Sequence, residues 1–244
     1  MSVKSFLKFS IGGLLLAAAL FIAPAAEAAR VYDFNALYRG LGYPSPDYFG
    51  STADEVMDLQ TYTSKDDTFY GEINGYLRFH PEPYEWYGTG PDDAKLIVER
   101  LDNIMGRAPA VPGDIVLFRG LGLGWHGNKP FADGEEFTDR GYVSTSVSYE
   151  VARYFAVEKD PEEAETSRRA VFVIYFTRPA ERGILVDQGE DEVMLERGRR
   201  FRVMARKEGV KKYDVYLVQA CAGECEAALR PQAEIFWSGF DAGD

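Results

Sequence analysis

Apolar residues recur at helical spacing through the first part of the chain, up to about residue 106. The first helical segment opens with the capping residues Ser51 or Thr52, and the last opens with Pro91 and ends at Gly106. These signals predict three helices, each with one apolar face toward a core. The predicted helices cover residues 51–62, 68–79 and 90–106.

After about residue 110 the pattern changes to short apolar runs that are typical of strands. The run at residues 169–178 is apolar on both faces, which predicts a central strand. We expect hairpin turns at Arg199–Arg200 and Gly209–Val210, and one helix at residues 148–160. A helical first part followed by antiparallel strands predicts an α+β domain. The other predicted strands cover residues 114–120, 192–198, 200–209 and 212–220.

The first 28 residues have the composition of a secretory signal peptide. Lys4 and Lys8 precede an apolar run at residues 9–23, and the Ala-Glu-Ala at residues 26–28 has the form of a signal-peptidase site. The alternative is a membrane anchor, but the run is shorter than the roughly 20 residues that a span requires. We therefore expect cleavage after residue 28 and a secreted or periplasmic domain at residues 29–244, without membrane insertion.

The charge balance is acidic, with 39 Asp and Glu residues against 27 Lys and Arg residues and a net charge of −12. An acidic surface repels phosphate backbones and anionic lipids, so we do not expect general nucleic-acid binding. A local basic pocket is compatible with this balance.

The chain contains two cysteines, Cys221 and Cys225, and two histidines, His80 and His126. An exported protein meets an oxidising compartment, which favours a local disulfide between the cysteines. The alternative is a metal site, but both histidines are remote from the cysteines in sequence, which gives a four-ligand zinc site little support. We expect a disulfide and no bound metal.

Two predicted strand ends carry polar residues suited to a site. Arg119 follows the apolar residues of "VLFRG", and a planar guanidinium grips a pyrophosphate through paired, charge-assisted hydrogen bonds. Ser144, Thr145 and Ser146 end the strand in "GYVSTS". Each feature alone has an ordinary alternative, namely a surface arginine and a strand that runs into a turn and caps the next helix.

Two carboxylates, Glu190 and Glu192, are separated by one residue directly before an apolar strand. In an extended segment such residues point to the same face, so both carboxylates would look into one site. There they could accept a hydrogen bond from a ribose hydroxyl and stabilise positive charge at an anomeric carbon. The alternative is a solvated acidic turn.

The second predicted helix and the residues before it present an aromatic face and polar groups, namely Tyr62, Tyr70, Asn74 and Arg78. The alternative is the normal polar side of an amphipathic helix. Phe155, on the helix after the Ser-Thr-Ser run, could cover a ligand, but periodic aromatic residues on a helix usually face the core.

In their order and spacing, these features together resemble the ADP-ribosyltransferase exoenzyme family. The resemblance is to the arginine–serine–glutamate class of C3-like exoenzymes and binary-toxin catalytic components, and it covers roughly residues 50–220. It rests on Arg119 in "LFRG", Ser144 in "GYVSTS", and Glu190 with Glu192 in "GEDEVMLERG". It implies two packed antiparallel sheets, a helical N-terminal half packed in front, and NAD in the cleft between them.

The resemblance also implies roles for individual residues. Arg119 would hold the NAD phosphates, and the backbone of Gly120 would contact the nicotinamide amide. Ser144 would orient Glu192, which would bind the ribose 2′-hydroxyl and stabilise the positive charge that develops as nicotinamide leaves. Further NAD contacts are expected from Tyr62, Tyr70, Asn74, Arg78, Thr145 and Ser146.

Glu190 would lie on the acceptor side. Family members with Glu at this position resemble those that modify arginine, and members with Gln resemble asparagine modifiers. A carboxylate can align an incoming guanidinium and help to deprotonate it, whereas an amide cannot take a proton.

The resemblance therefore implies a secreted mono-ADP-ribosyltransferase toxin or effector that modifies an arginine of a target protein and needs no metal. The alternatives are an NAD glycohydrolase with water as acceptor, and a non-catalytic binding module that has kept the fold. Glu190 favours the transferase, and the intact set of Arg119, Ser144 and Glu192 argues against the module. The chain shows no cell-binding domain, so a separate delivery component is one expected partner. Its acidic balance departs from the C3-like exoenzymes, which tend to be basic.

Overall fold

The computed structural model describes most of the chain between residues 48 and 225. The described residues are 48–64, 67–80, 90–111, 115–159, 167–176, 182–186, 192–210, 212–221 and 223–225. The predicted signal peptide and Glu190 lie outside these ranges. Among the described residues, no helix is both long and apolar enough to cross a membrane.

The described α-helices agree with the sequence pattern to within three residues at each end, whereas the short 3-10 helix at Gly124–His126 was not predicted. The first begins with the predicted cap, because Thr52 Oγ1 accepts the N–H of Glu55 and Glu55 Oε2 accepts the N–H of Thr52. Ser148 caps the last helix by accepting the N–H of Val151. The helices are α3 (Ala53–Tyr62), α4 (Asp67–Phe79), α5 (Pro91–Arg107), the short 3-10 helix η2 (Gly124–His126) and α6 (Tyr149–Val157).

Eight described strands form one sheet in the order β2-β7-β8-β4-β1-β3-β6-β5. All neighbouring pairs are antiparallel except β4 with β8, which is parallel. The strands are β1 (Val116–Gly122), β2 (Glu136–Asp139), β3 (Val143–Ser146), β4 (Arg169–Phe176), β5 (Gly183–Val186), β6 (Glu192–Leu195), β7 (Arg199–Val210) and β8 (Tyr213–Cys221).

This sheet has two sections that meet at a single point. The pairing of β1 with β3 has one pair of Cα partners, Phe118 and Ser146, whereas β1 and β4 are paired over seven. Apolar residues from both sections, among them Leu117 of β1 and Leu195 of β6, belong to one buried cluster. The two sections therefore pack face to face around a common core. The predicted α+β fold is confirmed, with two refinements: the two expected sheets are joined into one, and one strand pair is parallel.

One predicted turn is wrong. Arg199 and Arg200 are the first residues of β7, and the chain turns before them at Gly198, whose φ is 73°. β6 and β7 form no hairpin because β6 pairs with β3 and β5, whereas β7 pairs with β2 and β8. The predicted hairpin between β7 and β8 is confirmed, since the two strands are antiparallel neighbours. Its turn is displaced from the predicted Gly209–Val210, because these are the last residues of β7 and Val210 pairs with Tyr213.

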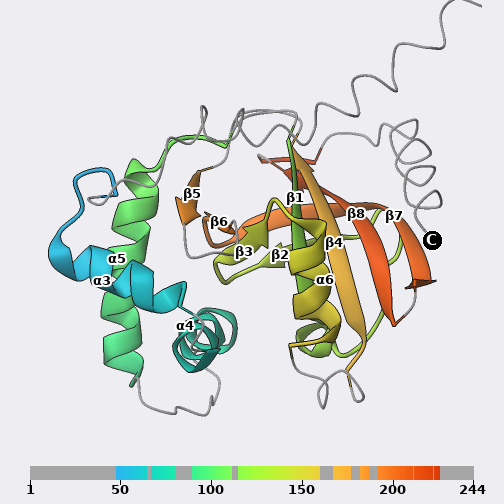
Figure 1. Cartoon of the computed structure of the whole chain (residues 1–244), viewed down its shortest axis with the longest axis horizontal. Coiled ribbons are helices and arrows are strands. Elements are labelled where there is room, and N and C mark those ends of the chain that lie inside the picture. The colour runs from blue at the N-terminus through green and yellow to red at the C-terminus, as the bar shows by residue number, and fades with distance from the viewer. Residues whose placement is uncertain are drawn as a thin grey trace, which may run out of the picture. The chain divides into compact units, whose positions relative to one another are not determined.

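The helices cover the sheet in two groups (Figure 1). α3 and α5 share a buried cluster with Ile184, Val186 and Met194 of β5 and β6. α6 packs on β1, β4 and β8 through Ala152 and Ala156. The two groups leave the junction of β1 and β3 between them. Near the end of the described chain, the expected disulfide joins Cys221 to Cys225.

Candidate active site

A cavity of about 490 Å³ opens where β1 and β3 separate. Beyond the Phe118–Ser146 pair the two strands are not paired. The residues after Phe118 on β1 and the two directly before Ser146 on β3 line the cavity. The lining residues are Tyr62, Thr63, Ser64, Tyr70, Arg78, Phe118, Arg119, Gly120, Leu121, Gly122, Gly124, Trp125, Ser144, Thr145, Ser146, Val151, Ala152, Phe155, Lys159, Arg169 and Glu192. The parting of the strands thus creates the space that the predicted site requires.

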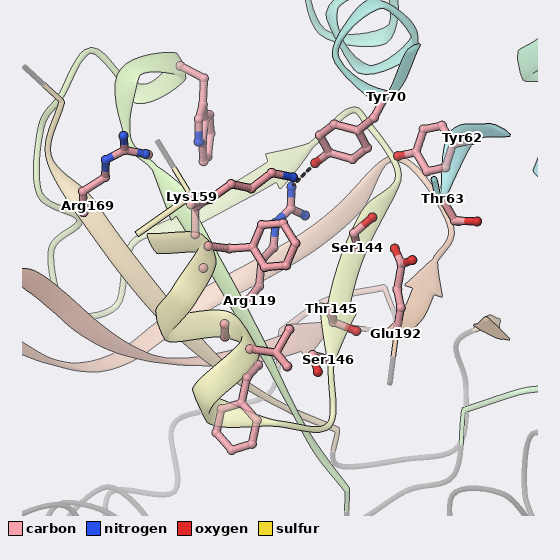
Figure 2. A pocket seen from close by; sticks show the side chains of 18 of the residues that line it. Tyr62, Thr63, Tyr70, Arg119, Ser144, Thr145, Ser146, Lys159, Arg169 and Glu192 are labelled. Atoms are coloured by element: carbon pink, nitrogen blue, oxygen red, sulfur yellow. Dashed lines mark hydrogen bonds between the residues drawn. The ribbon is translucent and has the colours of Figure 1, made fainter. Parts of the chain in front are cut away.

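Arg119 brings a largely buried guanidinium to this cavity. Its side chain is 7% exposed, and Nη1 lies 3.2 Å from Asp139 Oδ2. Nη2 donates to the Tyr70 hydroxyl at 3.5 Å, a contact that Figure 2 shows from the cavity side. A guanidinium carries five N–H donors, so these two contacts engage only part of its capacity.

Asp139 joins Arg119 to a second arginine, Arg78 of α4. Arg78 Nε donates to Asp139 Oδ1 at 3.0 Å and Nη2 donates to Oδ2 at 2.9 Å, which is a bidentate pair. Burial alone would raise the pKa of Asp139, but Arg119 and Arg78 outweigh burial and hold that pKa below its usual value. The carboxylate is therefore ionised at neutral pH, between two cations.

The hydroxyl run and Glu192 lie on neighbouring strands at the other side of the cavity. In the β3–β6 register Ser146 is opposite Glu192 and Ser144 is opposite Met194. Ser144 and Glu192 are therefore diagonal neighbours on one face of the sheet, and Figure 2 shows both at the cavity. Glu192 is 7% exposed. The orienting hydrogen bond from Ser144 to Glu192 stays a prediction.

The other two hydroxyls of the run bond to backbone. Thr145 Oγ1 donates to the carbonyl of Val193, and Ser146 Oγ accepts the N–H of Ser148 at the entry to α6. These bonds fasten β3 to β6 and to the following helix. Both residues still line the cavity.

Asn74 lies behind the cavity rather than in its wall. It is 1% exposed, its Nδ2 donates to the Tyr62 hydroxyl at 2.8 Å, and its Oδ1 accepts the N–H of Tyr142 at 2.9 Å. Tyr62 itself lines the cavity, and burial and the neighbouring Tyr70 raise its pKa well above the usual value. The described lining residues do not include Asn74, so its place favours a supporting role over the predicted contact with NAD.

Two further lining residues are Phe155 of α6 and Lys159, which follows the end of that helix. Phe155 lines the cavity and is only partly buried, so the expectation that it packs in the core is wrong. Lys159 Nζ lies 4.4 Å from the centre of the Phe155 ring, within cation–π distance. Arg169 at the start of β4 and Trp125 of η2 also line the cavity.

Gly120 follows Arg119 on β1 and also lines the cavity. A Cβ at this position would lie 1.7 Å from the backbone oxygen of Ala152 on α6. The lack of a side chain is therefore required for α6 to pack on β1, independently of any contact with a ligand.

Metal ligands are not gathered at this site or elsewhere in the described part of the chain. Within those residues there is no group of three or more His, Cys, Asp or Glu side chains arranged to hold an ion. His126 ring-stacks on Phe131 at 3.9 Å, and its Nε2 lies 3.6 Å from Glu135 Oε1.

Comparison with known protein families identifies the family of this chain. The family model described as ADP-ribosyltransferase exoenzyme matches residues 34–222. The chain belongs to this family. This exoenzyme is therefore, by family, an ADP-ribosyltransferase of the bacterial toxin type, a class of enzyme that uses NAD as its substrate.

Solved structures agree with this assignment at the level of the fold. The Vis toxin of Vibrio splendidus is 19% identical, with 82% of this chain and 87% of that chain covered and a TM-score of 0.57. The Plx2a toxin of Paenibacillus larvae is 16% identical, with 81% and 96% covered and a TM-score of 0.53. The C3 exoenzyme of Clostridium limosum is 16% identical, with 81% and 94% covered and a TM-score of 0.52. None of the curated proteins that were compared matches the exoenzyme.

The site of the exoenzyme thus contains most of the residues that the sequence motifs indicated. The predicted positions that line the cavity are Arg119, Gly120, Tyr62, Tyr70, Arg78, Ser144, Thr145, Ser146 and Glu192. Asn74 lies behind it and Glu190 is outside the described residues. Asp139 was missed, although it stands directly before the "RGYVSTS" motif, because its partner Arg78 is 61 residues away in sequence.

Proposed function

We propose that the exoenzyme transfers ADP-ribose from NAD to an arginine side chain of a target protein and releases nicotinamide. In this reaction the bond between the ribose C1′ and the nicotinamide nitrogen breaks, and its electron pair leaves with nicotinamide. A new bond forms between C1′ and a guanidinium nitrogen, which loses a proton. The proposal rests chiefly on the charge of the cavity.

The chain carries a net charge of −12, yet among the described residues that line the cavity there are four cationic side chains and one carboxylate, Glu192. Such a reversal of charge suits a substrate with a diphosphate, because guanidinium and ammonium groups make charge-assisted bonds to phosphate oxygens. The cavity volume of about 490 Å³ lies within the range of roughly 300–1,000 Å³ that small-molecule sites occupy. The cationic residues are Arg78, Arg119, Lys159 and Arg169.

Glu192 is the group we assign to the breaking bond. It would accept a hydrogen bond from the ribose 2′-hydroxyl and stabilise the positive charge that the ribose gains as nicotinamide leaves. Ser144, its diagonal neighbour, would orient the carboxylate. Arg119 would hold the diphosphate, and the backbone of Gly120 would face the nicotinamide amide.

Two complexes of related folds support the choice of substrates. The enzyme BECa of Clostridium perfringens, 14% identical with a TM-score of 0.52, was solved with NADH. This chain spans about half of that protein, because 47% of its length is covered. Vis was solved in complex with agmatine, whose guanidinium resembles an arginine side chain. Glu190, whose carboxylate can accept a proton from a guanidinium, supports the same acceptor from the sequence side.

We further propose that residues 1–28 are a cleaved signal peptide and that residues 29–244 act as one catalytic domain after export. The bridge between Cys221 and Cys225 supports an oxidising compartment. A separate component or a secretion route would deliver the domain to its target.

The test is incubation of the purified protein at residues 29–244 with NAD and agmatine, and in parallel with labelled NAD and a cell lysate. ADP-ribosyl-agmatine and a labelled protein band that arginine-specific cleavage removes are the expected products. Glu192→Gln should lower the rate at least about a hundredfold. Glu55→Gln is the matched control, because Glu55 is similarly buried but caps α3 away from the cavity.

The outcomes separate the alternatives. Nicotinamide release without any ADP-ribosylated acceptor would indicate an NAD glycohydrolase. No consumption of NAD by the folded protein would indicate a binding module.

A second variant tests the acceptor side. Glu190→Gln should abolish transfer to agmatine but leave some hydrolysis of NAD. Equal loss of both activities would remove Glu190 from the acceptor side.

A further inference from the structure

Asp139, the last residue of β2, contacts two of the cationic side chains that line the cavity, Arg78 and Arg119. It forms a bidentate pair with Arg78 at 3.0 and 2.9 Å, and its Oδ2 lies 3.2 Å from Arg119 Nη1. The two arginines come from α4 and β1, so this one carboxylate joins the helical layer to the central strand. The described residues that line the cavity do not include Asp139, and it is 5% exposed.

The carboxylate is itself held in place. Asp139 is paired with Arg199 in the β2–β7 register, and its Oδ1 accepts the N–H of Gly141 at 3.0 Å. Gly141 in turn is confined by α4, because a Cβ there would lie 2.3 Å from Asn74 Oδ1. The position of Asp139 is therefore set by the strand on one side and by the turn before β3 on the other.

This arrangement offsets the repulsion between the two positively charged arginine side chains. Two guanidinium groups that both face one diphosphate repel each other before the substrate arrives, and burial makes that repulsion stronger. A shared carboxylate balances one of the two charges and fixes the direction of both planar groups. The pair then keeps one net positive charge for the substrate and loses little conformational freedom on binding.

We propose that Asp139 is a positioning residue that holds Arg78 and Arg119 side by side as a preformed clamp for the diphosphate of the substrate. This inference rests on the proposed function, because it takes NAD as the substrate. Asp139 does not touch the reacting atoms and acts through the two arginines.

The test is Asp139→Asn, which keeps the shape of the side chain and an oxygen acceptor for the Gly141 N–H but removes the charge. The dissociation constant and the KM for NAD should both rise about 10- to 100-fold, as for other residues that orient a binding group. Because the clamp binds a part of NAD that does not react, kcat should change much less. Calorimetric titration with NAD and initial rates of nicotinamide release give the two quantities.

The matched control is Asp58→Asn. Asp58 is 7% exposed and pairs with Arg100 at 3.0 Å between α3 and α5, away from the cavity. The control loses an equally buried carboxylate of an ion pair, so it should lose stability while keeping the wild-type dissociation constant for NAD. Equal weakening of NAD binding in both variants would overturn the proposal, since a general loss of stability would then explain the effect.

Two further outcomes are distinguishable. If the wild type consumes NAD and folded Asp139→Asn binds it as tightly, the inference fails and the proposed function stands. If the wild type neither binds nor consumes NAD, both the inference and the proposed function fail.

If Asp139→Asn does not fold, NMR of the wild type tests the inference instead. The signal of the Arg78 Nε–H is assigned by its loss in Arg78→Lys. Slow solvent exchange of that proton with and without NAD supports the clamp, and fast exchange in the NAD-bound state refutes it.

Discussion

Gly120 lies on β1 where the backbone of α6 passes closest to the strand. A Cβ added there would be 1.7 Å from the backbone oxygen of Ala152 and 2.7 Å from the backbone nitrogen of Ala156. Real Cβ atoms essentially never approach a neighbour within 3.0 Å, so the oxygen would have to move by at least 1.3 Å. Both atoms belong to the helix backbone and cannot rotate away. Gly120→Ala must therefore displace α6 as a whole.

The expected cost follows from this displacement. Overpacking typically costs about 1–3 kcal/mol, and rigid surroundings place this site at the upper end, near 3 kcal/mol. The clash outweighs the gain of roughly 0.5–1 kcal/mol that Ala normally has over Gly inside a strand. Because a domain of this size has only about 5–15 kcal/mol of stability, the loss should be easy to detect.

Urea unfolding followed by circular dichroism measures it. With an m-value of about 1–3 kcal/mol/M, the midpoint should fall by about 1 M or more. Gly71→Ala is the control, because a Cβ at Gly71 in α4 meets nothing within 4 Å. That variant should be more stable by about 0.5–1 kcal/mol. A loss below about 1 kcal/mol for Gly120→Ala would refute the packing reason for the glycine and leave only its role toward the substrate.

Two further predictions concern the residues behind the cavity. Asn74→Ala should lower the unfolding free energy by about 1–3 kcal/mol, because it leaves the buried N–H of Tyr142 without its acceptor. Urea unfolding measures this loss, and a value under about 0.5 kcal/mol would contradict the prediction. Asp139 has a lowered pKa in the folded state, so it stabilises the fold above the ordinary pKa of about 3.9 and loses this effect as the pH falls through the lowered value. The stability difference between wild type and Asp139→Asn should therefore be full at pH 7 and shrink below about pH 4, and a pH-independent difference would contradict the pairing.

The local elements were largely predictable from the chain. Periodicity, caps and stop residues placed α3, α4 and α5, since each signal acts within a few residues of the helix that it describes. β2 and β5 were missed because four residues alone carry too short a pattern to be distinguished from a loop. β3 and β6 are equally short, but the hydroxyl run and the Glu192 motif marked them. The turn predicted at Arg199–Arg200 failed for a different reason. Adjacent strands in sequence were assumed to pair, whereas β6 and β7 belong to different sections of the sheet.

The site was predictable where its residues sit in motifs at strand ends. Arg119, Ser144 and Glu192 were identified by their order and spacing, and all three line one cavity. Phe155 was assigned to the core because its helical spacing does not reveal that this face of α6 borders an opening. Asp139 carries no local signal at all, since its function depends on partners that lie far from it in sequence.

The chain by itself determined its helices, its central strands and the chemical types gathered at the site, because these depend on side-chain pattern and on residues close in sequence. Only the tertiary structure decided that β1 and β3 part beyond Phe118 and Ser146, and that a cavity opens there. The same holds for the ion pairs of Asp139 with Arg78 and Arg119, which join α4, β1 and β2. Strand partners and buried ion pairs arise from long-range packing, and no local pattern of residues encodes them.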